Sequence, residues 1–191
     1  MDAVELELVQ RAKKGELAAF EQLFYRYQKR IYSFILQMVL DKDDTAELTQ
    51  DTFIRAYHSL SSLKSDEAFS SWLYRIAVNL VRDKMRKFSP DIESIDEPYT
   101  DQEGVEFKSD IADWSANPRE VTLQSELQDK IQTAISSLPK LQREAIILYH
   151  IEEMDIEQIS MILGVPSGTV KSRLARARDI LRIKLKPYVS S

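Results

Sequence analysis

The sequence of 191 residues lacks cysteine and contains only two histidines and four glycines. Without cysteine the chain can form no disulfide bond and no thiolate metal site, which fits a reducing cytosol. The two histidines, His58 and His150, argue against a zinc site built on imidazole, and we expect no metal and no cofactor. The glycines, at positions 15, 104, 164 and 168, cannot assemble a Walker loop or a dinucleotide fingerprint. These shortages argue against most familiar classes of enzyme.

Long hydrophobic runs are also absent, since the longest apolar stretches extend over only a few residues. No segment is therefore long enough to span a bilayer. The first residues, Met1 to Glu5, are acidic and lack the basic-then-apolar order of a signal peptide. With 43% hydrophobic and 30% charged residues, the composition is that of a folded globular protein. We therefore expect a cytoplasmic protein.

The net charge of −5 is distributed unevenly along the chain. Residues 1–88 carry 14 basic and 13 acidic side chains, and residues 121–191 carry 10 and 8. Between them, residues 89–120 carry 2 basic against 10 acidic side chains and contain three prolines. We interpret this segment as a flexible linker that self-repulsion extends. Residues 166–191 are locally basic, with 7 basic side chains and 1 acidic one, which favours contact with a phosphate backbone.

Helical periodicity dominates the sequence on both sides of the linker. In residues 1–88 we expect helices over 4–14, 17–39, 45–60 and 69–88, with a polar turn at 41–44 and a polar loop at 61–67. In residues 121–191 we expect a helix marked by Leu123 to Leu138, one from Pro139 to about His150, one over 155–163, and a last one from Gly168 or Thr169 to Leu185. The predicted fold is all-α, with two small helical domains, 1–88 and 121–191, joined by the flexible acidic linker 89–120.

The strongest motif lies near the C-terminus, in the sequence DIEQISMILGVPSGTVKSRLARARDIL. Asp155 can cap a short helix, Gly164 permits a tight turn, and Ser167 or Thr169 can cap the helix that follows. The outer face of that second helix carries Lys171, Ser172, Arg173, Arg176 and Arg178. This pattern is typical of a helix-turn-helix, whose second helix enters the major groove of DNA. A solvated basic helix on a protein-binding domain is the alternative.

A second pattern lies in the N-terminal half, where DTAELTQDTFIRAYHSL is followed by FSSWLYRIAVNLVRDKMRK. Together these sequences resemble the sigma factors of bacterial RNA polymerase, specifically the extracytoplasmic-function (ECF) group. The sequence GELAAFEQLFYRYQKRIY is similar to the opening helices of that family, and the segment from Leu138 to Leu181 is similar to its C-terminal domain. The resemblance covers nearly the whole chain apart from the linker.

The resemblance implies three sets of site residues. The N-terminal domain is expected to bind the polymerase clamp through the helix that contains Gln50, Asp51, Phe53, Ile54 and Arg55. It is expected to read the promoter −10 element through the loop at 61–71 and through Trp72, Tyr74, Arg75 and Asn79, with Arg82, Lys84, Arg86 and Lys87 on nearby phosphates. In the C-terminal domain, the implied −35 readers are Lys171, Ser172 and Arg176, with Arg173 and Arg178 on phosphates.

The chemistry of these side chains suits the implied roles. In the family a non-template base is flipped out of the stack into a pocket, and such a pocket needs amide and aromatic groups. Asn79 can supply both a donor and an acceptor, whereas Trp72 at its helical spacing is expected to lie in the core. Ala175 stands where larger side chains also occur in the family, so the −35 sequence stays open.

The resemblance also implies partners: core RNA polymerase, promoter DNA and an anti-sigma factor, which is often membrane-anchored. That factor would cover the surface around Phe53 or enter between the domains. The linker would either mimic a polyanion inside the polymerase or serve as a plain spacer. The chain itself is not expected to be an enzyme or to take a small-molecule substrate, and alone in solution it should bind DNA poorly.

Two other classes of function compete with this interpretation. An autonomous helix-turn-helix regulator would bind an operator without polymerase, but it would need a dimer interface or a ligand pocket, and the sequence shows no heptad seam. An enzyme would need a centre such as a hard metal held by Asp41, Asp43 and Asp44. A solvated turn explains that acidic run better, because no nucleophile or base accompanies it.

Overall fold

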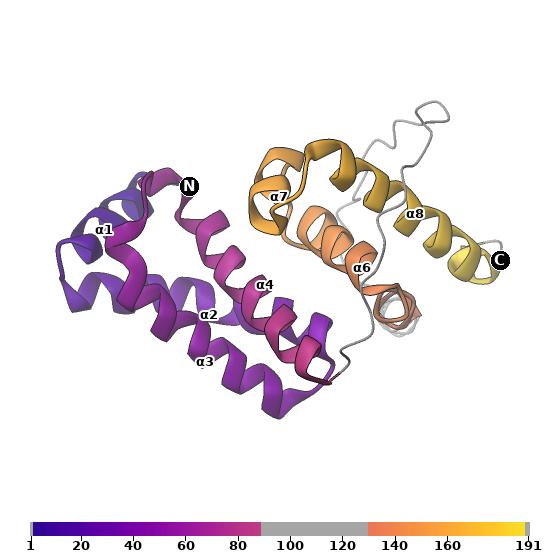
Figure 1. Ribbon diagram of the computed structural model, residues 1–191, viewed down its shortest axis with the longest axis horizontal. Helices are drawn as coiled ribbons and strands as arrows, with labels where there is room; N and C mark the ends of the chain where they lie inside the picture. Colours follow the sequence, from indigo (N-terminus) through magenta and orange to yellow (C-terminus); the bar gives the residue numbers. More distant parts are fainter. Residues whose placement is uncertain (1, 89–129, 190–191) are drawn as a thin grey trace, which may run out of the picture.

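The computed structural model describes residues 2–88 and 130–189, and these residues contain helices and turns but no strand. They form an N-terminal and a C-terminal group of helices that lie side by side (Figure 1). The all-α prediction is confirmed. The predicted linker, residues 89–120, lies outside the described residues, as do Leu123 and Leu127.

The N-terminal domain consists of four helices around one apolar core. Its helices are α1 (Ala3–Lys13), α2 (Leu17–Val39), α3 (Lys42–Ser59) and α4 (Phe69–Phe88). Helix α2 supplies much of the core, because apolar residues recur every three or four positions and are buried from Ala19 to Met38. The helix ends at Leu40, which adopts the left-handed conformation with φ of 64°. Gly15 turns the chain between α1 and α2 with φ of 90°.

Helix α3 begins earlier than the sequence pattern indicated. Residues 42–44 were expected in a polar turn, but they form the first turn of α3, and the expectation was wrong there. The Asp41 carboxylate caps the helix by accepting a hydrogen bond from the Asp44 backbone N–H at 2.8 Å. Asp43 and Asp44 in this first turn also suit the positive end of the helix dipole. The acidic run is therefore a helix start.

The expected polar loop before α4 contains two 3-10 turns, Leu60–Ser62 and Asp66–Ala68. Lys13 at the end of α1 holds the loop, because its ammonium donates to the Leu63 carbonyl at 2.8 Å and to Asp66 at 2.6 Å. Helix α4 then extends over Phe69–Phe88, as predicted.

The C-terminal domain contains a helical segment at 130–136, α6 (Lys140–Ile146), α7 (Ile156–Leu163) and α8 (Ser167–Val189). The expected continuous helix to His150 was wrong in part, because α6 gives way to a π-helical turn, η3 (Ile147–Ile151). Helix α8 is longer than expected at both ends. Its core contacts are those of the predicted motif, with Val170, Leu174 and Ala177 buried against α6 and α7.

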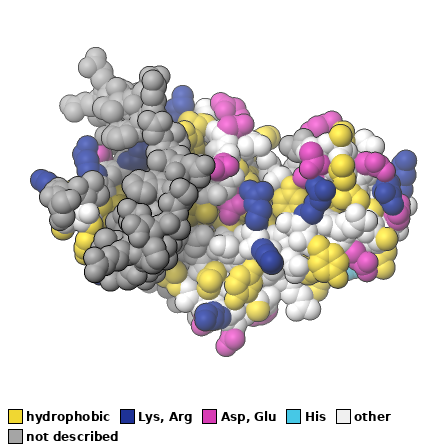
Figure 2. Space-filling view, turned by 180° about the vertical axis from the view of Figure 1, so that it is seen from behind, with side chains coloured by type: hydrophobic (Ala, Val, Ile, Leu, Met, Phe, Trp, Pro, Cys, Tyr) yellow, Lys and Arg dark blue, Asp and Glu magenta, His cyan; other side chains and the backbone are white. Residues whose placement is uncertain are grey.

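The two domains are packed against each other. Helix α4 lies against α7, and α2 contacts α6. Viewed from the opposite side, the surface mixes hydrophobic, basic and acidic side chains (Figure 2). Among the described residues, no helix is long and apolar enough to cross a membrane.

Candidate nucleic-acid interface

The helix-turn-helix geometry is complete in α7 and α8. The Asp155 carboxylate accepts from the Gln158 backbone N–H at 2.7 Å, and the Gln158 side chain accepts from the Asp155 backbone N–H at 3.0 Å. This reciprocal pair is a capping box, which fixes the start of α7. Gly164 ends α7 in the left-handed conformation with φ of 69°, so the chain can turn into α8.

The five predicted −35 residues all lie on α8, but they differ in exposure. Lys171 and Arg178 are exposed, whereas Ser172 and Arg176 are half-buried. The fifth, Arg173, is buried, so the structure does not place it on the surface where a phosphate contact was expected. The Arg178 guanidinium lies over the Tyr149 ring, 5.4 Å from its centroid, and this contact links α8 to the π-helical turn.

The predicted −10 residues lie along α4. Arg75, Asn79, Arg86 and Lys87 are exposed, and Trp72 is half-buried against the core with its ring 6.0 Å from that of Phe69. Because positions 72, 75, 79, 82 and 86 are three or four apart, these side chains follow one stripe of the helix. The stripe combines an aromatic ring, an amide and several cations.

Tyr74 does not belong to this stripe, because the structure buries it instead of placing it on the exposed surface where a −10 contact was expected. Its ring is fully buried and packs edge-on against Phe34, with centroids 5.3 Å apart. Its hydroxyl donates to the Glu152 carboxylate of the other domain. Burial and this carboxylate raise the pKa of Tyr74, so the hydroxyl stays protonated as a donor.

The predicted phosphate-binding cations of α4 already have carboxylate partners. Lys84 contacts Asp44 at 2.7 Å and Glu47 at 3.0 Å, and these hydrogen bonds raise its pKa. Arg86 contacts Asp83 at 2.7 Å on the surface of the same helix. Arg82 reaches across to the C-terminal domain, where two of its nitrogens contact the Glu144 carboxylate at 3.1 and 2.6 Å. All three cations would have to exchange these partners to bind a phosphate.

The predicted polymerase-binding residues lie on α3. Gln50, Ile54 and Arg55 are exposed and Asp51 is half-buried, whereas Phe53 is buried with its ring 4.8 Å from that of Phe24. Phe53 therefore supports this surface from beneath. Beside it lies a groove of about 660 Å³ between α2 and α3, lined by Phe24, Gln28, Lys29, Tyr32, Ala46, Thr49 and Gln50. Such a groove can receive a partner's side chains.

Sequence reasoning missed the residues that join the two domains, namely Arg30, Glu144 and Glu152. No local signal marked Glu144, which follows Arg143 and directly precedes the apolar run that begins at Ala145, although the structure buries it fully. A charge at such a position requires a partner of opposite sign. The sequence could not show that the partner, Arg82, lies 62 positions away.

The described residues contain no group of three or more His, Asp or Glu side chains arranged to hold a metal ion. The enzyme alternative required a hard-metal centre at Asp41, Asp43 and Asp44. Those residues cap and begin α3.

Both domains match known families. Residues 23–89 match the family described as Sigma-70 region 2, and residues 128–181 match Sigma-70, region 4. The first match covers α3 and α4, and the second covers the helix-turn-helix. The two matches lie on either side of the predicted linker.

Curated relatives align over nearly the whole chain. ECF RNA polymerase sigma factor SigW of Bacillus subtilis is 34% identical over 186 residues, which cover 97% of this chain and 99% of that protein. ECF RNA polymerase sigma-E factor of Escherichia coli K12 is 36% identical over 187 residues, covering 95% of this chain and 94% of that protein.

Solved structures show the same fold. CnrH, solved in complex with the cytosolic domain of CnrY, superposes with a TM-score of 0.68 at 24% identity, covering 98% of this chain and 99% of that one. The sigma factor RpoE of Bartonella quintana, solved with the anti-sigma factor NepR, gives a TM-score of 0.63 at 25% identity, with 87% and 96% covered. The motif-based prediction is confirmed, and the chain belongs to the ECF group of RNA polymerase sigma factors.

Proposed function

We propose that the two domains of this sigma factor divide promoter recognition, with α4 reading the −10 element and α8 reading the −35 element. The chain acts as a transcription initiation factor that binds core RNA polymerase and brings it to promoter DNA. The observation that carries the division is the presence of two separate basic helices, one in each domain, with polar side chains along one face of each. The domain boundaries we propose are 1–88 and 121–191.

In the C-terminal domain, the N-terminal half of α8 enters the major groove. Lys171, Ser172 and Arg176 face the base edges, and Arg178 holds a phosphate. Arg173 acts differently from the expectation, because its buried side chain supports the helix from within.

In the N-terminal domain, Asn79 and Trp72 receive an unstacked base of the non-template strand. The exposed Asn79 amide offers one acceptor and two donors, and the half-buried Trp72 ring offers a stacking face. Arg75, Arg86 and Lys87 follow the backbone beside that base. Arg82 and Lys84 join them after exchanging their carboxylates for phosphates.

The polymerase clamp binds the α3 surface that carries Gln50, Asp51, Ile54 and Arg55, of which Gln50 also lines the groove between α2 and α3. The polymerase supplies all the catalysis, and the chain contributes recognition in the cytoplasm, where the polymerase works. We also propose an anti-sigma partner, since RpoE was solved in complex with one.

The experiment that tests this function is run-off transcription by sigma-free bacterial core polymerase on a library of randomised promoters. We expect the enriched templates to carry two conserved boxes at a fixed spacing. Failure to transcribe, combined with specific binding of the chain alone to a duplex, would instead support the autonomous regulator.

A further inference from the structure

The interface between the two domains is built around two acidic side chains of the C-terminal domain. Glu144 of α6 and Glu152 at the end of η3 leave only 1% and 4% of their side chains exposed. A buried carboxylate is costly unless a cation or several donors compensate it. The three side chains that compensate them, Arg82, Arg30 and Tyr74, come from the N-terminal domain.

Glu144 binds Arg82 of α4 through both carboxylate oxygens. The nitrogen–oxygen distances are 3.1 and 2.6 Å, and a third nitrogen of Arg82 donates to the Leu163 carbonyl at the end of α7 at 3.1 Å. A two-pronged contact of this kind fixes orientation as well as distance. Lys140 and Arg143 also lie near Glu144, so this carboxylate sits among cations from both domains.

Glu152 binds two groups of the N-terminal domain. Arg30 of α2 approaches it at 3.1 and 3.2 Å, and the buried Tyr74 hydroxyl of α4 donates to the same oxygen. Arg30 also donates to the Glu152 backbone carbonyl at 3.4 Å. The C-terminal domain thus presents two carboxylates at separate points, and α2 and α4 present the matching donors.

We propose that Glu144 and Glu152 form an interdomain latch that keeps the chain closed, with Glu144 occupying the position of a DNA phosphate on Arg82. This inference concerns the regulation of promoter binding and rests on the proposed function. The latched chain is the form free of polymerase, and simultaneous binding to the −10 and −35 elements requires the latch to open.

The size of the promoter explains why the closed form is inactive. The positions named −10 and −35 are about 25 base pairs apart, which is roughly 85 Å of B-form DNA at 3.4 Å per pair. A compact chain of this length has a radius of gyration of roughly 16 Å. Two domains that are packed together cannot reach both elements at once, so the polymerase must hold them apart.

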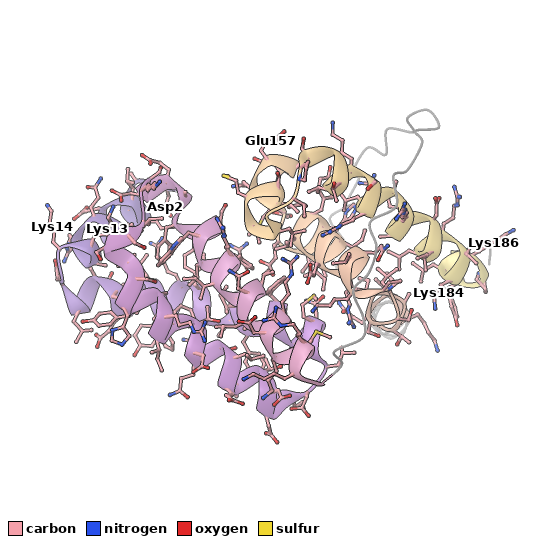
Figure 3. All side chains as sticks on the ribbon, in the orientation of Figure 1. Asp2, Lys13, Lys14, Glu157, Lys184 and Lys186 are labelled. Carbon is pink, nitrogen blue, oxygen red and sulfur yellow. The ribbon has the colours of Figure 1, made fainter. Side chains whose placement is uncertain are left out.

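The latch predicts that removing both negative charges opens the free chain. The variant is Glu144→Gln with Glu152→Gln, which keeps the size of each side chain but removes its charge and replaces one acceptor oxygen with an NH2 donor. The matched control is Glu21→Gln with Glu157→Gln, which changes the net charge equally at exposed positions. Figure 3 shows Glu157 projecting outward from α7.

Small-angle X-ray scattering of the full chains measures the opening directly. We expect the latch variant to have a larger radius of gyration and maximum dimension than the wild type and the control. We also expect it to bind a fluorescent single-stranded −10 oligonucleotide at least about tenfold more tightly, because apparent affinity scales with the binding-competent fraction. Circular dichroism verifies that its helices are intact.

A charge swap distinguishes the loss of the latch from a loss of folding. Arg30→Glu alone places a carboxylate against Glu152 and should open the chain. Combining it with Glu152→Arg restores an opposite-charge pair and should return the scattering curve to the wild-type shape. Arg30 is not among the residues assigned to DNA or to the polymerase.

Run-off transcription with core polymerase separates the latch from the proposed function. Unchanged scattering and unchanged oligonucleotide affinity in the latch variant, while all chains support transcription, would overturn the latch. An opened latch variant whose transcription equals the wild type in the presence of polymerase would confirm it. Opening without transcription by any chain, wild type included, would confirm the latch and overturn the proposed function.

Discussion

Helices α4 and α8 are both basic, but their cations are placed differently. On α4, Arg82, Lys84 and Arg86 each contact a carboxylate, and Arg82 does so across the domain interface. On α8, Lys171 is exposed at the start of the helix, and Arg178 lies over the aromatic ring of Tyr149. The comparison teaches that similar charge patterns in sequence can place cations differently: Arg82 is compensated across the domain interface, whereas Lys171 faces solvent.

This difference has a consequence for the order of binding. The exposed Lys171 can meet DNA while the two domains stay packed, whereas Arg82 of α4 must first exchange the Glu144 carboxylate for a phosphate. A screened surface pair contributes little, so Lys84 and Arg86 exchange readily. Arg82 exchanges only with separation of the domains, because Glu144 is buried in the interface.

The largest expected effect concerns the −35 contacts of α8. Arg176→Ala should weaken use of the cognate −35 element by about 1–3 kcal/mol, the scale of one good base contact. Run-off transcription on cognate and −35-substituted promoters measures it, and Lys184→Ala, at an exposed position near the end of the same helix, is the control (Figure 3). Equal transcription by Arg176→Ala and wild type would refute the assignment.

The next effect concerns α4. Asn79→Ala should reduce promoter opening more than closed-complex formation, by about 1 kcal/mol for each hydrogen bond lost to the flipped base. Permanganate footprinting reports the opening, and filter binding reports the closed complex. A footprint identical to that of the wild type would count against the role of Asn79.

A third prediction tests the support of α8 rather than its contacts. Asp155→Ala removes the capping box and should lower the free energy of unfolding of the C-terminal domain by about 1 kcal/mol. Hydrogen exchange of the α7 and α8 amides, measured over a series of urea concentrations, reports the loss of unfolding free energy. The amides of α1 serve as the internal control. Equal protection at α7 in both chains would show that the cap is unimportant.

The smallest effect sharpens the contrast between the two helices. In the chain alone, Arg178→Ala should weaken duplex binding and reduce the salt dependence by about one phosphate contact. Arg82→Ala should leave duplex binding by the chain alone unchanged, because Arg82 is paired with Glu144. Titrations over a range of salt concentrations compare the two, and a similar loss in both variants would contradict the contrast.

Much of the fold followed from the sequence because its signals are local. The apolar period of α2, the cap at Asp155 and the glycine at 164 each depend on residues within a few positions, and all three were found where expected. The start of α3 was missed because an acidic run reads equally well as a turn and as a capped first helical turn. The π-helical turn at 147–151 contains no proline or glycine, so no local signal predicted it.

The candidate sites were less predictable because exposure depends on tertiary contacts. Tyr74 and Arg173 lie on helices that were correctly expected, but only the packing shows that both are buried. Similarly, Glu144 and Glu152 read as ordinary helix positions until their partners from the other domain are known. Local pattern identifies helices, whereas the role of a charged side chain depends on what faces it.

The most direct test of the division of labour repeats the promoter selection with three proteins: wild type, Arg176→Ala and Asn79→Ala. Each is combined with sigma-free core polymerase and selected on the same randomised library. The division predicts two conserved boxes with the wild type, loss of conservation in the −35 box alone with Arg176→Ala, and loss in the −10 box alone with Asn79→Ala. Loss of conservation in both boxes with either variant would contradict it.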